Sequence, residues 1–84
     1  MNKLEMFKKK LIYRSNYRGT KEMDILLSGF VKKYIDKFNQ EELNQLDEFL
    51  DYEDEVISNY YYYGTIDQNI DKNIISKIFK EYSI

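Results

Sequence analysis

The stretch TKEMDILLSGFVKKYIDKF, residues 20–38, decides the fold of this 84-residue chain. Its apolar residues recur at intervals of three and four, the spacing that places side chains on one face of an α-helix. They are Met23, Leu26, Leu27, Phe30, Val31, Tyr34 and Phe38. The interior Gly29 weakens such a helix without ending it. The pattern therefore predicts that the longest helix covers about residues 20–38 and that the other segments pack on it.

Helical spacing of apolar residues also occurs on both sides of this stretch. A first helix is predicted over about residues 2–13. Asn39 followed by Glu42 is the pattern of a capping box and predicts the start of a third helix. Gly64 is expected to end a short fourth helix, and residues 67–71 introduce a fifth. Sustained strand-type alternation is missing, so the sequence predicts an all-α protein, a small bundle of about five helices.

Composition restricts the possible functions. A chain of this length, residues 1–84, is most simply a single domain, too small for a large internal catalytic cleft. It contains no cysteine and no histidine, which excludes thiol nucleophiles, imidazole bases and zinc sites with these ligands. No nucleophile lies beside a base, and no glycine loop is suited to phosphate. We therefore expect a protein that is not an enzyme, with no catalytic residues and no metal site.

Charge is unevenly distributed along the chain. Residues 1–21 carry five lysines and two arginines against one glutamate, a net charge of +6, whereas residues 22–84 carry a net −8. No apolar run approaches the roughly 18 residues of a membrane span, and the N-terminus lacks the apolar core of a secretion signal. We therefore expect no membrane insertion and a soluble, intracellular chain.

The junction between the first two predicted helices, residues 14–24, looks least like packing. Arg14 and Arg18, the only arginines, lie four residues apart, and guanidinium pairs well with carboxylate or phosphate. The alternative is a solvated pair near a helix end. Gly19 fits a turn with positive φ or the close approach of another molecule. It also fits an ordinary helix N-cap with Glu22 at the third helical position.

Three further groups have both a functional and a plain interpretation. Glu22 and Asp24 are either acceptors on the same surface or acids in the first turn of a helix. The tyrosines at 60–63 sweep roughly 300° around a helix, so at least one ring is expected to be exposed, either at an interface or simply in solvent. The acidic run at 51–55 lacks the spacing of a calcium loop and is predicted to be a solvated connection.

The segments Tyr13–Ser15, Arg18–Asp24 and Leu26-Leu27 resemble the signature of the succinate dehydrogenase assembly factor 2 family, the small flavinylation factors called SdhE in bacteria. The hallmark of this family is Arg-Gly-x-x-Glu, found here from Arg18 onward. The resemblance covers about residues 7–64 with compatible spacing.

This resemblance implies a five-helix domain that binds the flavoprotein subunit of succinate dehydrogenase, and sometimes that of fumarate reductase. The family promotes covalent attachment of FAD to a histidine of that subunit. The chain would be an assembly chaperone of the bacterial cytoplasm, monomeric when free, with no cofactor of its own, because FAD belongs to the partner. The residues implied at the partner contact are Arg18, Gly19 and Glu22 from the motif, Arg14 and Asp24 beside it, and Tyr60, where the family commonly has tryptophan. A second departure is Glu55, where the family commonly has proline.

Two other functions remain open from the residues alone. A small helical domain with a basic end could bind nucleic acid through Lys8, Lys9, Lys10, Arg14 and Arg18. A generic protein adapter could use the tyrosine cluster. The first predicts strongly salt-dependent binding to nucleic acid, and the second predicts self-association; the resemblance favours neither, and no nucleic acid partner is expected.

Overall fold

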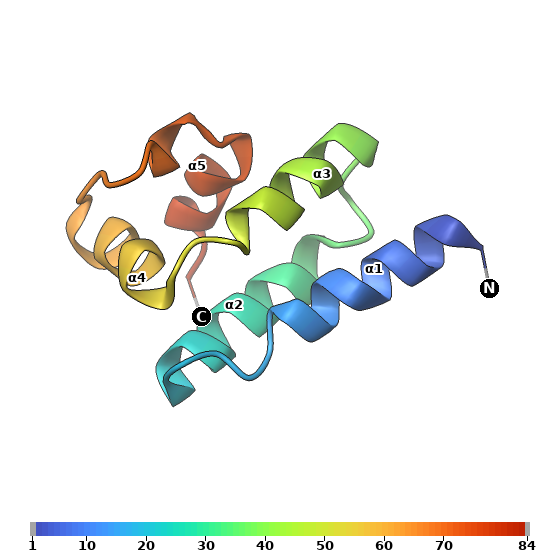
Figure 1. Ribbon diagram of the computed structural model, residues 1–84, viewed down its shortest axis with the longest axis horizontal. Coiled ribbons are helices and arrows are strands. Elements are labelled where there is room, and N and C mark those ends of the chain that lie inside the picture. Colours follow the sequence, from blue (N-terminus) through green and yellow to red (C-terminus); the bar gives the residue numbers. More distant parts are fainter. Residues whose placement is uncertain (1, 84) are drawn as a thin grey trace.

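Five α-helices and one short 3₁₀ helix make up the computed structural model, which describes residues 2–83 (Figure 1). In chain order the elements are α1 (Lys3–Arg14), α2 (Lys21–Tyr34), α3 (Gln40–Phe49), α4 (Asp54–Tyr63), η1 (Ile70–Lys72) and α5 (Ile74–Glu81). No strand occurs within this part of the chain. The prediction of an all-α fold with about five helices is confirmed.

Helix α2 is the longest element and supplies the centre of the core. Its apolar face is buried, and Phe30 is completely inaccessible to solvent. Four aromatic rings surround Phe30 with centroids 5.1–6.4 Å away: Tyr34, Phe38, Phe79 and Tyr82. Because two of these rings come from the last 6 residues of the chain, the C-terminal segment closes on the same centre as α2.

The predicted end of this helix at Phe38 is wrong by four residues. The helix ends at Tyr34, and the amides of both Lys37 and Phe38 donate to the Tyr34 carbonyl, which tightens the chain into a turn. Ile35 and Phe38 remain buried in that turn. Apolar periodicity therefore continued past the helix because the turn also faces the core.

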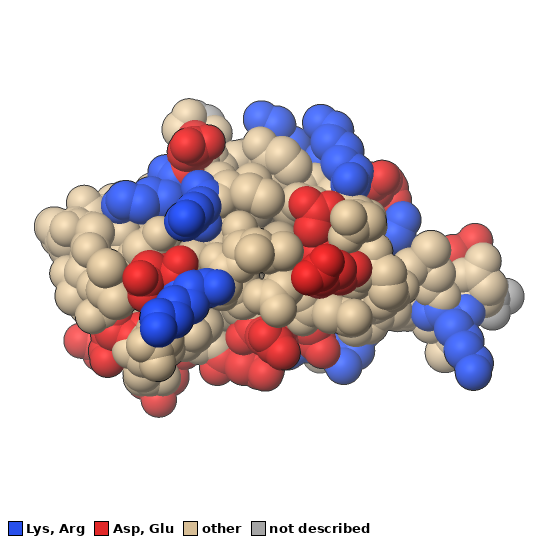
Figure 2. Space-filling view, turned by 90° about the horizontal axis from the view of Figure 1, so that it is seen from above, with Lys and Arg blue, Asp and Glu red and all other residues tan. Residues whose placement is uncertain are grey.

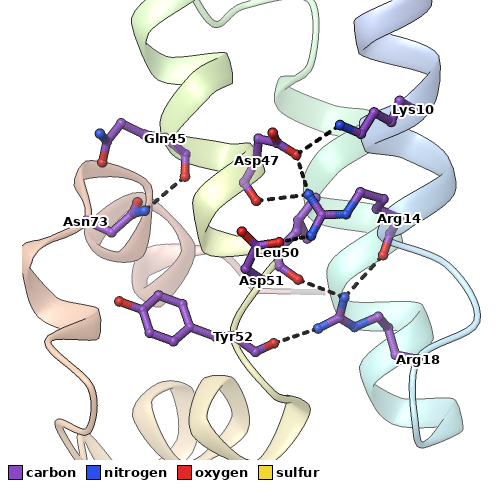
Figure 3. Close-up of polar contacts among 9 residues, drawn as sticks. All are labelled: Lys10, Arg14, Arg18, Gln45, Asp47, Leu50, Asp51, Tyr52 and Asn73. Carbon is purple, nitrogen blue, oxygen red and sulfur yellow. Dashed lines mark hydrogen bonds and ion pairs between the residues drawn. The ribbon is translucent and has the colours of Figure 1, made fainter.

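Helix ends follow the predicted capping residues closely. Asn39 and Glu42 form the expected capping box at the start of α3. Gly64 ends α4 with φ of 71°, in the left-handed region that suits glycine. Asn73 caps α5 and also donates to the Gln45 carbonyl at 2.9 Å, which fixes α5 against α3 (Figure 3).

The tyrosines at 60–63 turn around α4 as expected. Tyr60 is in the core, Tyr61 is half-buried, and Tyr62 and Tyr63 are exposed, which confirms that at least one ring faces solvent. Across residues 2–83, none of the helices combines the length and the apolar character required to cross a bilayer.

We expect Phe30→Ala to lower the free energy of unfolding by about 3–5 kcal/mol, because it removes the ring at the centre of the aromatic cluster and leaves a cavity. Urea denaturation followed by circular dichroism measures this change. Ile25→Ala, on the solvent side of the same helix, is the control and should cost much less. Equal losses in the two variants would contradict the central position assigned to Phe30.

Candidate functional site

The guanidinium of Arg18 joins the ends of three helices, and Figure 3 shows its contacts with the carbonyls of Arg14, Leu50 and Tyr52. Its Nε donates to Asp54 Oδ1 at 2.7 Å, at the first residue of α4. One Nη donates to the carbonyls of Arg14 and Leu50, both at 3.2 Å, at the ends of α1 and α3. The other donates to the Tyr52 carbonyl at 3.0 Å, between α3 and α4. Only 13 % of the Arg18 side chain is exposed, so this guanidinium stabilises the packing of the three helix ends.

Arg14, the last residue of α1, makes a second set of contacts. It pairs with the carboxylates of Asp47 and Asp51 and donates to the Asp47 carbonyl at 3.0 Å. Lys10 approaches the same Asp47 carboxylate at 3.9 Å. The arginines are therefore not a solvated pair, and they are also not free for another molecule. The prediction that the acidic run at 51–55 is a solvated connection holds at Asp51, which is 72 % exposed although it pairs with Arg14, and is wrong at Asp54, which begins α4 and is mostly buried against Arg18.

Gly19 lies against the carboxylate that binds Arg18. Its amide donates to Asp54 Oδ2, and a Cβ built on Gly19 would lie 2.9 Å from that oxygen. Gly19 has no positive φ, and the N-cap of α2 is Thr20, whose side chain accepts from the Met23 amide at 3.2 Å. The turn and N-cap interpretations of Gly19 are therefore wrong. Close approach explains the glycine, and the approaching group belongs to the same chain.

The two acids of the junction have different surroundings. Asp24 is half-buried and accepts from the Arg18 amide, which fixes the start of α2 against the turn before it. Glu22 is exposed, and none of the ion pairs found within residues 2–83 involves it. Glu22 is therefore the motif residue that the fold leaves available.

A surface hollow of about 400 Å³ lies between the start of α2 and α4. Its walls are Gly19, Thr20, Glu22 and Met23 on one side, and Asp54, Glu55, Ser58 and Tyr62 on the other. We call this feature the α2–α4 hollow. Two of the three motif residues line it, and the third, Arg18, holds its two sides together through Asp54. The motif therefore shapes this hollow.

Tyr60 lies apart from the junction network and is only 6 % exposed. Burial raises the pKa of its hydroxyl, with a further contribution from the charge of Asp71. Lys80 donates to the Tyr60 carbonyl at 2.9 Å and lies over its ring. In this structure Tyr60 has a packing role, so any influence it has on a partner acts through the position of α4.

Among the predicted site residues, the structure joins four into one network: Arg14, Arg18, Gly19 and Asp24. Glu22 lies beside the network at the hollow. The sequence analysis did not identify the carboxylates that pair with the two arginines, which belong to Asp47, Asp51 and Asp54. No short-range pattern identifies them, because they lie 33–37 residues from the arginines that they bind.

Together these features define a small all-α protein with a surface hollow beside its Arg-Gly-x-x-Glu motif. Within residues 2–83 no group of acids is arranged to hold a metal ion. A protein-family model described as "Flavinator of succinate dehydrogenase" matches residues 9–82. The chain therefore belongs to this family of succinate dehydrogenase assembly factors, in agreement with the Arg-Gly-x-x-Glu signature and with a protein that is not an enzyme. The match also includes α5, beyond the region in which the signature was found.

Curated relatives support the same assignment. The chain is 40 % identical to "Succinate dehydrogenase assembly factor 2, mitochondrial" of Debaryomyces hansenii and 41 % identical to that of Scheffersomyces stipitis, each over 92 % of this chain. It is 44 % identical to a Saccharomyces cerevisiae relative of the same name over 74 % of this chain. The alignments cover 55 %, 52 % and 36 % of those proteins, so the chain spans about half of their length or less. No solved structure matches the chain.

These relatives contradict the expected bacterial cytoplasmic location, because they are yeast proteins named as mitochondrial. The expectation depended on the lack of a recognisable targeting peptide in the sequence. Such a peptide is an address and makes no contribution to the folded domain, so the composition of a domain does not report its compartment.

We expect Asp54→Asn to lower the free energy of unfolding by about 1–3 kcal/mol, because it leaves the mostly buried Arg18 guanidinium without its anion. Asp51→Asn is the matched control, since it removes a carboxylate partner of the other arginine from a side chain that is 72 % exposed. That change should cost less than about 1 kcal/mol. Chemical denaturation of both variants measures the difference, and similar costs would show that burial of the Arg18 pair contributes nothing.

Gly19→Ala should destabilise the protein by about 1–2 kcal/mol, because the new methyl group displaces the Asp54 carboxylate from the Gly19 amide. A double-mutant cycle with Asp54→Asn tests the cause. The two changes remove the same contact, so their effects should be clearly less than additive. Strict additivity would mean that Gly19 is needed for another reason.

Proposed function

We propose that this chain binds the flavoprotein subunit of succinate dehydrogenase and promotes the covalent attachment of FAD to it. The observation that carries the proposal is the match of the flavinator family model to residues 9–82. The 40–41 % identity to fungal assembly factors over nearly the whole chain supports it. FAD and the histidine that receives it belong to the partner in this proposal, and the chain has no cofactor of its own.

The chemistry available in the chain fits an accessory role. With no histidine and no cysteine, it has neither an imidazole base nor a thiol nucleophile. What it can supply is binding energy, which fixes the partner in a geometry where its own groups react. Fixing reacting groups in the correct orientation can lower a barrier substantially without any new chemical group.

The α2–α4 hollow is the docking surface that we propose. Glu22 is exposed and free to bind, and the exposed Tyr62 adds aromatic surface to the opposite wall. Arg18 and Asp54 act from within by holding the start of α2 against α4. In this proposal the motif has two parts. Arg18 and Gly19 hold the start of α2 against α4, and Glu22 contacts the partner.

The contacts of the basic residues count against the nucleic acid alternative. Four of the five residues in the basic end are paired within the chain: Lys8 with Asp36, Lys10 and Arg14 with Asp47, and Arg18 with Asp54. Figure 2 shows basic and acidic side chains interspersed on one face of the molecule, without a continuous basic patch. Nucleic acid is bound by unpaired cations, which replace the counterions condensed on its phosphates, and this end has few such cations.

We expect Glu22→Ala to weaken binding of the flavoprotein subunit by about tenfold or more and to lower covalent FAD in that subunit when binding is limiting. Co-expression with the cognate subunit, followed by in-gel flavin fluorescence, measures the second effect. Alanine is a good helix former, so α2 should remain intact.

Glu41→Ala is the control for this test. Glu41 is also an exposed acid in the first turn of its helix, so both variants lose a similar favourable interaction with the helix dipole. Only the Glu22 variant should lose binding. If both variants support normal flavinylation, the role of the hollow is wrong, and if wild-type protein neither binds nor promotes flavinylation, the proposed function itself is wrong.

A further inference from the structure

Two tyrosines at the end of α1 project into solvent. Tyr13 is 70 % exposed and Tyr17 is 82 % exposed, and their ring centroids are 5.8 Å apart. Each aromatic side chain is large enough to dominate a contact surface when it is covered by a partner. No contact in the core accounts for this pair, because both side chains lie almost entirely outside the fold.

The backbone of Tyr17 adds an independent observation. Its φ is 58°, in the left-handed region that residues with a Cβ rarely adopt. Of the other non-glycine residues with positive φ in the described chain, Gln68 and Asn69 are polar residues in the loop before η1. A bulky aromatic residue is the least suited of the three to this conformation. Backbone strain of this kind concentrates at functional sites, where the orientation it produces is used.

The tyrosine pair is continuous with the docking surface. Tyr17 directly precedes Arg18 and Gly19, and Gly19 lines the α2–α4 hollow. Figure 1 shows the α1–α2 connection and the start of α2 at the same end of the molecule as α4. A partner seated on the hollow therefore needs to extend only a short distance to cover the two rings.

The charges near the pair indicate what kind of surface would cover it. Among the cations nearest along the chain, Lys10, Arg14 and Arg18 are paired with acids of α3 and α4, whereas Lys9 and Lys21 are exposed and take part in none of the ion pairs found within residues 2–83. The surface that remains free here is therefore mainly aromatic area with two hydroxyl groups, with lysines only at its margins. Tyrosine is enriched in the well-packed centres of protein interfaces for this reason.

We propose that Tyr13 and Tyr17 are an aromatic contact site for an apolar patch on the flavoprotein subunit, which extends the docking surface from the hollow across the α1–α2 connection. This inference rests on the proposed function. The left-handed backbone at Tyr17 turns its ring outward, and the chain retains a tyrosine there because the ring is covered in the complex.

The test compares affinity with stability. Tyr17→Asn keeps a residue that tolerates positive φ but removes the ring, and Tyr13→Ala removes the other ring from an exposed helical position. Binding of the purified cognate flavoprotein subunit, measured by calorimetry, should weaken about tenfold in each variant. The midpoint of thermal unfolding of Tyr17→Asn should rise by about 4 °C, because strain is relieved while no core contact is lost.

Gln68→Asn is the matched control, because it relieves the same type of backbone strain in another exposed loop. It should raise the unfolding midpoint similarly and leave the affinity unchanged. Affinities within twofold of wild type for both tyrosine variants would overturn the inference while the proposed function stands. A lower unfolding midpoint for Tyr17→Asn would also overturn it, because the ring would then serve the fold.

Two remaining outcomes are also decisive. If wild-type protein fails to bind the flavoprotein subunit, the proposed function and the tyrosine site are both wrong. If light scattering shows a dimer that Tyr17→Asn converts to a monomer, the rings are covered by a second copy of the chain, and the flavoprotein contact assigned to them is wrong.

Discussion

The bond between the Arg18 guanidinium and the Asp54 carboxylate is the interaction on which the rest of this structure depends. A helix leaves its last carbonyl groups without partners, and two helices end where Arg18 lies. The guanidinium donates to one carbonyl at each of these ends, while Asp54 balances its charge from the start of a third helix. The planar fork of arginine serves these separate acceptors at once, which the single ammonium of lysine would not do.

Gly19 follows from this arrangement. The Asp54 carboxylate has two oxygens, and the one not used by Arg18 accepts from the Gly19 amide. A side chain at position 19 would occupy the space of that oxygen, so the arginine and the glycine of the motif serve the same carboxylate. Glu22 points away from this contact and stays in solvent. The Arg-Gly-x-x-Glu pattern thus combines two residues needed for the fold with one that the fold leaves exposed.

Local patterns predicted the helices well, because periodicity and capping act over a few residues. The capping box at Asn39 and the left-handed Gly64 were both readable from short sequence windows. The acceptors of the arginines were not, because Asp47, Asp51 and Asp54 lie more than 30 residues away along the chain and look like ordinary surface acids. Gly19 was misassigned for the same reason, since its neighbour Asp54 comes from another helix. Tyr60 was implied at the partner contact but is buried. Which tyrosine of a run of four is buried depends on the side of α4 that α5 covers, and a short stretch of sequence does not show this.

The same network limits which residues can report on a partner. A substitution at Arg18, Gly19 or Asp54 changes the position of α2 relative to α4, so it alters the hollow even if the side chain never touches another protein. Loss of binding in such a variant would not distinguish a contact from a support. Exposed residues with no internal ion pair, such as Glu22, give the clearer result, because their removal leaves the contacts of Asp54 with Arg18 and Gly19 intact. The partner contact of this fold is therefore best mapped from residues that the fold does not need.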